Sequence, residues 1–145
     1  GVAFGSELII DRMEKLQAIV SSRASGYSQA VMKTWFNEPA GWMRERIAQH
    51  QAIRDDLLAQ LRSAEGVNVR TTEAGSYLFP RIPELNVTIK DFVKILRLQA
   101  DVTVTPGTEF GPGFTSSFRI NFSQNHQAAV AAMDRLIQIM NRYRR

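Results

Sequence analysis

One arginine in the sequence has the setting of a group that could bind a carboxylate. Arg119 lies in the middle of segment 117–123, where polar residues alternate with three apolar ones, Phe118, Ile120 and Phe122. This alternation is typical of a strand with one buried face, and it places Arg119 on the other face. A guanidinium held on a strand can bind a carboxylate through two parallel hydrogen bonds. A surface arginine without a ligand fits the spacing equally well, so both interpretations stay open at this point.

The segment before this strand is rich in glycine. Residues 107–113 contain three glycines, but they have neither the Lys-Ser/Thr pair of a P-loop nor the G-x-G-x-x-G order. We therefore expect a shaped loop near a site rather than a phosphate-binding cradle. Residues 26–30 nearly match a nucleophile elbow, but a polar segment precedes them where a buried strand is needed. Ser28 is therefore interpreted as an ordinary helix residue.

The composition limits the remaining chemistry. The chain has no cysteine, which excludes disulfides, thiolate nucleophiles and cysteine-based metal clusters. It has two histidines, His50 and His126, so we expect no histidine-built metal site. His50 falls on an apolar helical stripe, which favours a structural role, and His126 is expected to be exposed near a helix start.

The net charge of +4 does not indicate a nucleic-acid partner. Three of the 18 basic residues crowd the end of the chain (Arg142, Arg144 and Arg145), and no basic stripe interleaved with aromatics occurs elsewhere. No apolar run approaches the ~18 residues of a membrane span. A cysteine-free chain also fits a reducing compartment. We therefore expect no nucleic-acid or membrane partner and a cytoplasmic location.

Hydrophobic periodicity predicts the elements that position these residues. In the first part of the chain it predicts a buried strand over 1–5, helices from about Ser6 and from about Tyr27, and a long third helix ending at Gly66. The period then changes to that of strands. The rest of the prediction comprises a hairpin of strands 67–70 and 76–79, a helix capped by Thr88, strands 102–104 and 117–123, and a last helix reaching Tyr143.

This order predicts an α/β fold of the α+β sandwich type, with helices packed on one side of a small mixed sheet. The content of 44% hydrophobic and 22% charged residues suits a globular chain. Residues 41–145 are expected to form a compact domain. Residues 1–40 are expected to be the tail of a larger domain and a helical connector, because an apolar start at Gly1 needs neighbours from a longer polypeptide.

Three separated stretches together resemble the C-terminal part of a fold-type I, class I/II aminotransferase that depends on pyridoxal phosphate. The first, GVAFGSELI at 1–9, is similar to the strand and helix that follow the Schiff-base lysine in that family. The second, AGSYLFP at 74–80, is similar to a strand of the family's small domain. The third is the most specific, with a Pro-Gly and a Phe-Gly at 104–111 and a strand arginine within 118–122. Together they cover essentially the whole chain.

The resemblance implies roles for five residues. Arg119 matches the arginine that clamps the substrate α-carboxylate, and Tyr77 falls where an aromatic residue lines the substrate pocket. Phe110 and Gly111 match the loop that borders the site. Arg23 more loosely resembles an arginine that some acidic-substrate members send into the partner subunit's site. The family's Tyr-Ser-Asn-Pro-Pro stretch is replaced after it, so aspartate specificity does not follow.

For the intact enzyme, the resemblance implies transfer of an amino group between an amino acid and a 2-oxo acid by a homodimer. Pyridoxal phosphate is expected to be bound by a large domain outside this chain. None of the lysines matches the Schiff-base position (Lys15, Lys33, Lys90 and Lys94). Because the reaction needs that lysine, we expect this chain alone to hold no catalytic or cofactor-binding residue and not to transaminate.

Two alternatives stay open. Another fold-type I enzyme, such as a carbon–sulfur lyase, would share carboxylate recognition of the Arg119 type. A stand-alone α/β binding module without catalysis would be a complete gene product that folds without exposed apolar surface.

Overall fold

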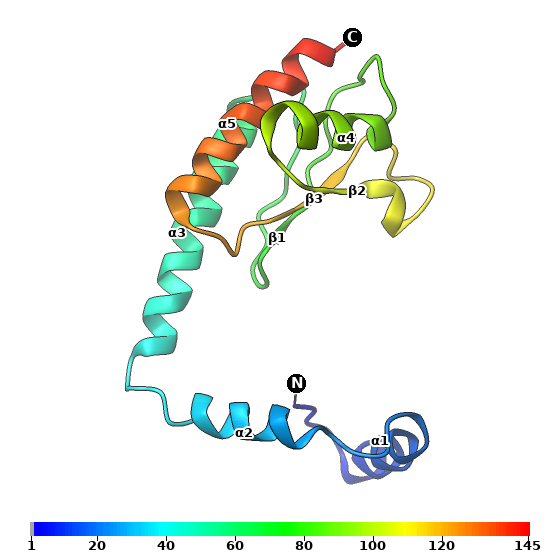
Figure 1. The fold of residues 1–145 in the computed structure, drawn as a ribbon, viewed down its shortest axis with the longest axis vertical. Helices are drawn as coiled ribbons and strands as arrows, with labels where there is room; N and C mark the ends of the chain where they lie inside the picture. The colour runs from blue at the N-terminus through cyan, green and yellow to red at the C-terminus, as the bar shows by residue number, and fades with distance from the viewer. Residues whose placement is uncertain (1) are drawn as a thin grey trace. The chain divides into compact units, whose positions relative to one another are not determined.

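The computed structural model describes residues 2–145, which divide into two compact units, one ending at Trp42 and the other comprising Met43–Arg145. Figure 1 shows the helices and strands of both units. The first contains helices α1 (Glu7–Val20) and α2 (Gly26–Trp35). Helix α1 begins directly after Ser6, as predicted, although the Ser6 side chain makes no capping hydrogen bond.

The buried strand predicted over residues 1–5 is wrong for the part that the structure describes. Residues 2–5 are exposed and belong to no strand, and Gly1 lies outside the described residues. A strand exists only where a neighbour accepts its N–H groups and donates to its carbonyls. Among residues 2–145, no segment pairs with residues 2–5 in this way.

The second unit contains a three-stranded sheet, formed by β1 (Tyr77–Leu78), β2 (Thr105–Pro106) and β3 (Phe118–Asn121). Strand β3 is central, in the order β1-β3-β2, and both pairings are antiparallel. In this register Leu78 lies opposite Ile120, and Thr105 lies opposite Arg119. The predicted α/β class is confirmed, with the correction that this sheet is antiparallel rather than mixed.

Two predicted strands are reduced or displaced. The first strand of the predicted hairpin survives as one bridge, in which Asn68 and Arg81 exchange two backbone hydrogen bonds of 2.8 Å. The strand predicted over 102–104 is not formed, and β2 begins directly after it, at Thr105. The N–H of Val102 donates to the carbonyl oxygen of Leu96 at 3.2 Å. This hydrogen bond belongs to the C-terminal end of the preceding helix, at the point where the strand was expected to begin.

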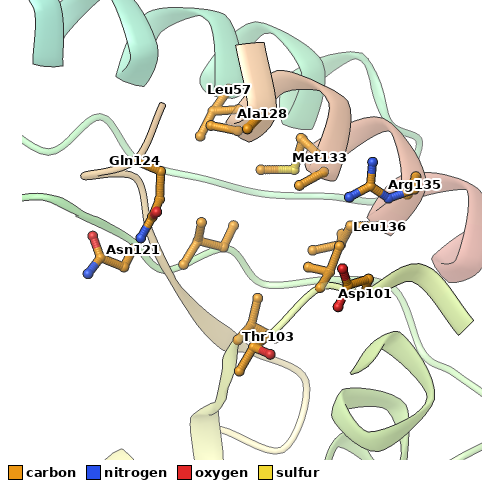
Figure 2. Close-up of a pocket in the computed structure, with 14 residues that line it drawn as sticks. Leu57, Asp101, Thr103, Asn121, Gln124, Ala128, Met133, Arg135 and Leu136 are labelled. Carbon is orange, nitrogen blue, oxygen red and sulfur yellow. The ribbon is translucent and has the colours of Figure 1, made fainter. Parts of the chain in front are cut away.

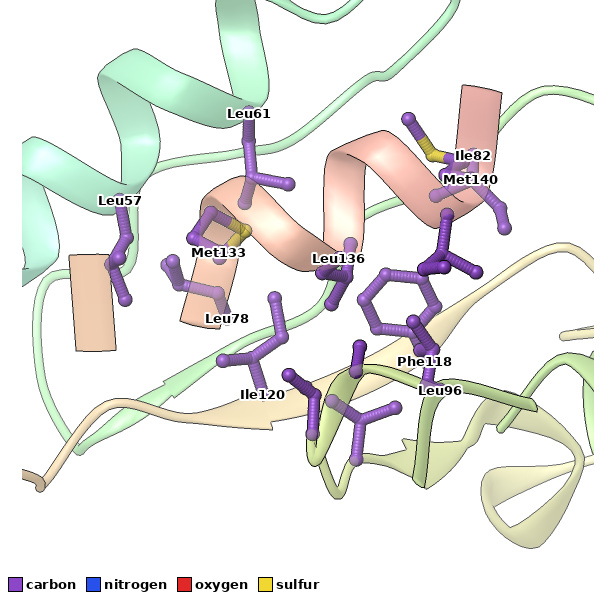
Figure 3. Packing of buried hydrophobic residues seen from close by; sticks show 14 of the residues in the cluster. Leu57, Leu61, Leu78, Ile82, Leu96, Phe118, Ile120, Met133, Leu136 and Met140 are labelled. Carbon is purple, nitrogen blue, oxygen red and sulfur yellow. The ribbon is translucent and has the colours of Figure 1, made fainter. Parts of the chain in front are cut away.

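Three helices cover one face of the sheet: α3 (Trp42–Ser63), α4 (Ile89–Ala100) and α5 (His126–Tyr143). Figure 3 shows apolar side chains from these helices meeting those of the strands. The residues buried to 1% exposure or less include one or more from each of these helices and from β1 and β3 (Leu57, Leu61, Leu78, Leu96, Phe118, Leu136 and Met140). This face buries the apolar residues of the strands, so the alternate residues lie on the opposite, outer face.

Side-chain caps fix the starts of helices α4 and α5. The Thr88 hydroxyl accepts a hydrogen bond from the backbone N–H of Asp91 at 3.2 Å, and it donates to the Asp91 carboxylate at 2.7 Å. The predicted cap at Thr88 is therefore confirmed. Asn125 caps α5 in the same way, because its Oδ1 accepts from the N–H of Ala128 at 3.1 Å. Such caps satisfy backbone donors that the first helical turn leaves free.

Candidate carboxylate-binding site

Arg119 lies on the outer face of the central strand. Its neighbours Phe118 and Ile120 are 0% and 8% exposed on the helix-covered face, whereas Arg119 itself is half-buried. The predicted alternation along this strand is therefore confirmed. A central strand is held from both sides, so it positions the base of the arginine side chain more firmly than a loop would.

Two aromatic rings flank the guanidinium of Arg119. Its Cζ lies 4.4 Å from the ring centroid of Tyr77 and 5.0 Å from that of Phe110. Tyr77 belongs to β1, and Phe110 ends the short 3-10 helix η1 (Gly107–Phe110) that follows β2. Since β3 runs between β1 and β2, the two rings come from elements on opposite sides of the arginine's strand. Both contacts are within the range of a cation–π attraction, which holds the cation in place.

The hydrogen-bond donors of Arg119 are uncommitted. Within residues 2–145, no carboxylate forms an ion pair with it, and no acceptor takes a hydrogen bond from its guanidinium. Arg144 behaves differently, because it forms an ion pair of 2.6 Å with Glu65. The hydrogen bond and charge of Arg144 lower the pKa of the Glu65 carboxyl. A guanidinium has five N–H donors, so Arg119 can offer a planar pair of them to a ligand.

The glycine-rich segment has a defined shape beside the site. Gly107 is buried, and its N–H donates to the carbonyl oxygen of Ser117 at 2.7 Å, next to the start of β3. A Cβ at this position would fall 2.5 Å from the Ser117 oxygen and closer still to the carbonyl oxygen of Phe114. Gly111 has a φ of 145°, a conformation that favours glycine. These two glycines let the chain turn tightly enough to place Phe110 over Arg119.

Two further aromatic residues at the site were not predicted from the sequence. The ring of Phe79 meets that of Phe110 edge to face at 5.5 Å and that of Phe114 at 5.3 Å. A signal for Phe79 existed, because it follows Tyr77 by two residues and so shares its face of the strand. Phe114 carries no such signal, since its position depends on the path of the loop.

The structure thus brings together three of the five residues proposed from the sequence. Arg119, Tyr77 and Phe110 are in contact, and Gly111 directly follows Phe110 in the bordering loop. Arg23 lies in the first unit, exposed in the turn after α1.

The two histidines lie outside this site. His50 Nδ1 lies 3.0 Å from the Arg46 carbonyl oxygen, and its Nε2 lies 3.0 Å from Ser123 Oγ, which joins α3 to the segment after β3. The His126 side chain is 43% exposed, as expected, and its Nε2 lies 2.7 Å from Asp56 on α3. Among residues 2–145, no group of three or more potential ligands is placed to bind a metal ion.

A cavity on another side of the second unit is also separate from Arg119. It lies between α5, the segment leading into β2 and the end of β3 (Figure 2). Leu136 and Met133 of the core form its apolar part. Arg135 lines it but donates through Nε to the Ala100 carbonyl at 2.8 Å, at the end of α4. Arg119 does not line this cavity, so the two features are distinct.

The fold agrees with the comparisons with known proteins. The sequence model of the family "Aminotransferase class I and II" matches residues 1–136. The chain belongs to this family. No helix among the described residues is both long enough and apolar enough to span a membrane.

Several relatives are named aspartate aminotransferases. The chain is 28% identical over 152 residues to the aspartate aminotransferase of Rhizobium meliloti (strain 1021), covering 98% of this chain and 37% of the relative. It is 24% identical over 133 residues to that of Pyrococcus abyssi, covering 91% and 34%. The crystal structure of an aspartate aminotransferase from Rhodobacter sphaeroides 2.4.1 has 65% identity and a TM-score of 0.90, over 98% of this chain and 36% of that chain. The chain therefore spans between 34% and 37% of the length of these relatives.

The family implies pyridoxal phosphate, and the lysines of this chain do not fit that cofactor. Lys15 and Lys94 are 74% and 73% exposed on helix surfaces, where they pair with Asp11 and Asp91. The other two, Lys33 and Lys90, are also exposed. A lysine that reacts with the cofactor must project into an enclosed site beside the bound substrate. None of these four positions provides such surroundings.

Proposed function

We propose that this chain is the C-terminal part of an aminotransferase dependent on pyridoxal phosphate, and that Arg119 binds the α-carboxylate of its substrates. The full-length enzyme would transfer an amino group between an amino acid and a 2-oxo acid. The observation that carries the proposal is the state of Arg119, which is half-buried between two rings with its hydrogen-bond donors uncommitted. The names of the relatives support the reaction class.

The chain's own residues would bind and orient the substrate. Two N–H groups of Arg119 donate to the two oxygens of the carboxylate, which fixes the plane of that group. Tyr77 and Phe110 hold the guanidinium in place, and their rings are each 44% exposed, so a ligand can still reach the arginine. Fixing one end of a substrate in this way lowers the entropic cost of reaching the reactive geometry.

Pyridoxal phosphate supplies the electron sink for this class of chemistry. Because the lysines described above do not fit it, we propose that the rest of the full-length polypeptide holds the cofactor. The 145-residue chain alone would then neither bind it covalently nor transaminate.

The first unit supports a place within a larger enzyme. No residue of α1 or α2 is buried, although both helices carry apolar residues at helical spacing. Leu16, Ile19 and Val31 are 62%, 83% and 69% exposed. Such a surface is typical of an interaction site. We therefore propose that residues 1–40 are the tail of the large domain and a connector, and that residues 41–145 are the small domain. We also propose that the full-length enzyme is a cytoplasmic homodimer without a nucleic-acid or membrane partner.

Arg23 is the fifth proposed substrate-binding residue. It would extend from the connector toward a substrate held by the partner subunit, and Gly111 would shape the border of the site. The role of Arg23 rests on the resemblance alone. That of Gly111 is also supported by its φ of 145° directly after Phe110.

The test of the reaction class uses the full-length protein loaded with pyridoxal phosphate. An amino acid donor is supplied with and without a panel of 2-oxo acid acceptors, and release of the donor's own 2-oxo acid is measured. Release that requires an acceptor supports the aminotransferase. Release of a thiol or sulfide without an acceptor would instead identify a carbon–sulfur lyase, and no turnover with bound carboxylates would identify a binding module.

A further inference from the structure

A second layer of aromatic residues stands behind the rings that contact Arg119. The register places Tyr77 opposite Asn121 and Leu78 opposite Ile120, so the next residue, Phe79, falls opposite Arg119 itself. Its side chain therefore lies on the outer face of the sheet, beside the arginine. Phe79 nevertheless makes no cation–π contact with Arg119, because its ring packs against the rings of the loop.

The ring geometry around Phe79 is specific. Its plane makes an angle of 90° with that of Phe110 and 89° with that of Phe114, at centroid separations of 5.5 Å and 5.3 Å. Edge-to-face arrangements at such distances are the favourable ones for aromatic pairs. The ring of Phe79, the residue directly after β1, thus engages both ends of the loop segment 110–114.

Phe110 needs this support because the backbone around it does little to fix the direction of its ring. It ends a four-residue 3-10 helix, and Gly111 follows with a φ of 145°. Short 3-10 turns have poorer hydrogen-bond geometry than α-helices, and the ring of Phe110 is 44% exposed. Without a packing partner, the ring could turn away from Arg119 into solvent.

We infer that Phe79 is a positioning residue, which holds Phe110 against the Arg119 guanidinium and so keeps the arginine ready for a carboxylate. Phe114 also packs against Phe79, edge to face at 5.3 Å. The inference rests on the proposed function of Arg119. An arginine held in one conformation before binding loses less side-chain entropy when a ligand arrives. Loss of the Phe79 ring should therefore weaken carboxylate affinity without touching the reacting atoms.

The test compares five variants of the full-length protein loaded with pyridoxal phosphate, of which two carry Arg119→Lys, alone and together with Phe79→Leu. Phe79→Leu removes the ring, and Phe79→Tyr keeps it. Phe122→Leu is the matched control, because Phe122 is 2% exposed in the core and does not contact the aromatic cluster around Arg119. The Kd of the probe 2-oxoglutarate, the KM and kcat of turnover, and the thermal midpoint are measured for each.

We expect Phe79→Leu to raise Kd and KM by about three- to tenfold, the worth of one edge-to-face pair, with kcat nearly unchanged. Phe79→Tyr should stay close to the wild type. Phe122→Leu should lower the thermal midpoint without changing Kd. In an Arg119→Lys background, Phe79→Leu should raise Kd little further, because Phe79 acts on binding only through the Arg119 guanidinium.

Three results would overturn the inference, and they distinguish its failure from that of the proposed function. If Arg119→Lys weakens binding but Phe79→Leu leaves Kd unchanged, as Phe122→Leu does, Phe79 has no positioning role and the proposed function stands. Full additivity of Phe79→Leu and Arg119→Lys would have the same meaning. If Arg119→Lys itself leaves Kd unchanged, the proposed function fails, and the inference fails with it.

Discussion

Replacement of Gly107 by alanine is a sharp test of how the loop beside Arg119 is built. Gly107 is buried at the start of η1, and its N–H donates to the carbonyl oxygen of Ser117. An added Cβ would meet two backbone oxygens, those of Ser117 and Phe114. Backbone atoms cannot swing aside as the end of a flexible side chain can, so η1 or the 114–117 segment must move.

The size of the effect follows from these distances. The Cβ would stand 2.5 Å from the Ser117 oxygen, whereas a carbon–oxygen contact normally needs about 3.3–3.6 Å. The two segments must therefore separate by about 1 Å. Overpacking of this kind costs about 1–3 kcal/mol, and loss of the Gly107 hydrogen bond would add about 1 kcal/mol. We expect Gly107→Ala to lower the free energy of unfolding by about 2–4 kcal/mol.

The assay is urea unfolding followed by circular dichroism, with Gly113→Ala as the matched control. Gly113 lies in the same loop, but a Cβ there would meet nothing within 4 Å. That variant should change the free energy of unfolding by less than about 1 kcal/mol in either direction. Equal stabilities of the two variants would refute the close approach of Gly107 to the carbonyls, and with it this explanation of how Phe110 is placed.

Three further outcomes are expected in the same unfolding assay. Thr88→Ala should destabilise the protein by about 1 kcal/mol, since it removes the cap of α4. Hydrogen bonds from Thr88 and, to a lesser extent, from Lys94 lower the pKa of Asp91 in the folded protein. The ionised carboxylate of Asp91 therefore stabilises the fold above the ordinary carboxyl pKa of about 4. This stabilisation is lost as the pH falls through the lowered pKa of the folded protein. Asp91→Asn should therefore be less stable than the wild type at pH 7 and converge with it in acid, and a gap that persists at pH 2 would contradict this. Leu61→Ala should cost about 2–5 kcal/mol, because Leu61 is 0% exposed in the core.

Much of the fold could be predicted where the signal is local. Alternating Phe118, Ile120 and Phe122 indicated the buried face of β3, since period two is a property of any strand with one covered side. Thr88 and Asp91 indicated the start of α4, because a cap is formed by residues three positions apart.

The errors lie where structure depends on a partner that is distant in sequence. Residues 102–104 alternate like a strand, but Asp101 adopts a φ of 52° and turns the chain back toward α4. The pattern of residues 67–70 indicated a strand but carried no information about its partner. In the structure this segment pairs only through a single bridge to Arg81. Residues 2–5 are apolar enough for a buried strand and have no neighbour among the described residues to pair with.

The same distinction holds for the candidate site. The strand pattern placed Arg119 on the outer face but left its role open. The resemblance to a family then indicated the carboxylate role and added Tyr77 and Phe110, which the structure brings into contact with Arg119. Phe114 could not be predicted, since it reaches Phe79 only because Gly107 and Gly111 shape the loop between them.

The most direct test of the central claim compares Arg119→Lys with Arg81→Lys in the full-length protein loaded with pyridoxal phosphate. Arg81 is a matched control, because it is exposed and lies opposite Ser117, outside the pair of rings. The Kd of 2-oxoglutarate and of its α-amide is measured by calorimetry. Lysine keeps the charge but loses the planar pair of donors.

We expect Arg119→Lys to weaken binding of the acid by about 10- to 100-fold, the worth of a charged hydrogen-bond pair, and to leave the already weak binding of the amide nearly unchanged. Arg81→Lys should bind both ligands as the wild type does. Equal losses for the acid and the amide, or no loss for either, would contradict the claim that Arg119 recognises the α-carboxylate.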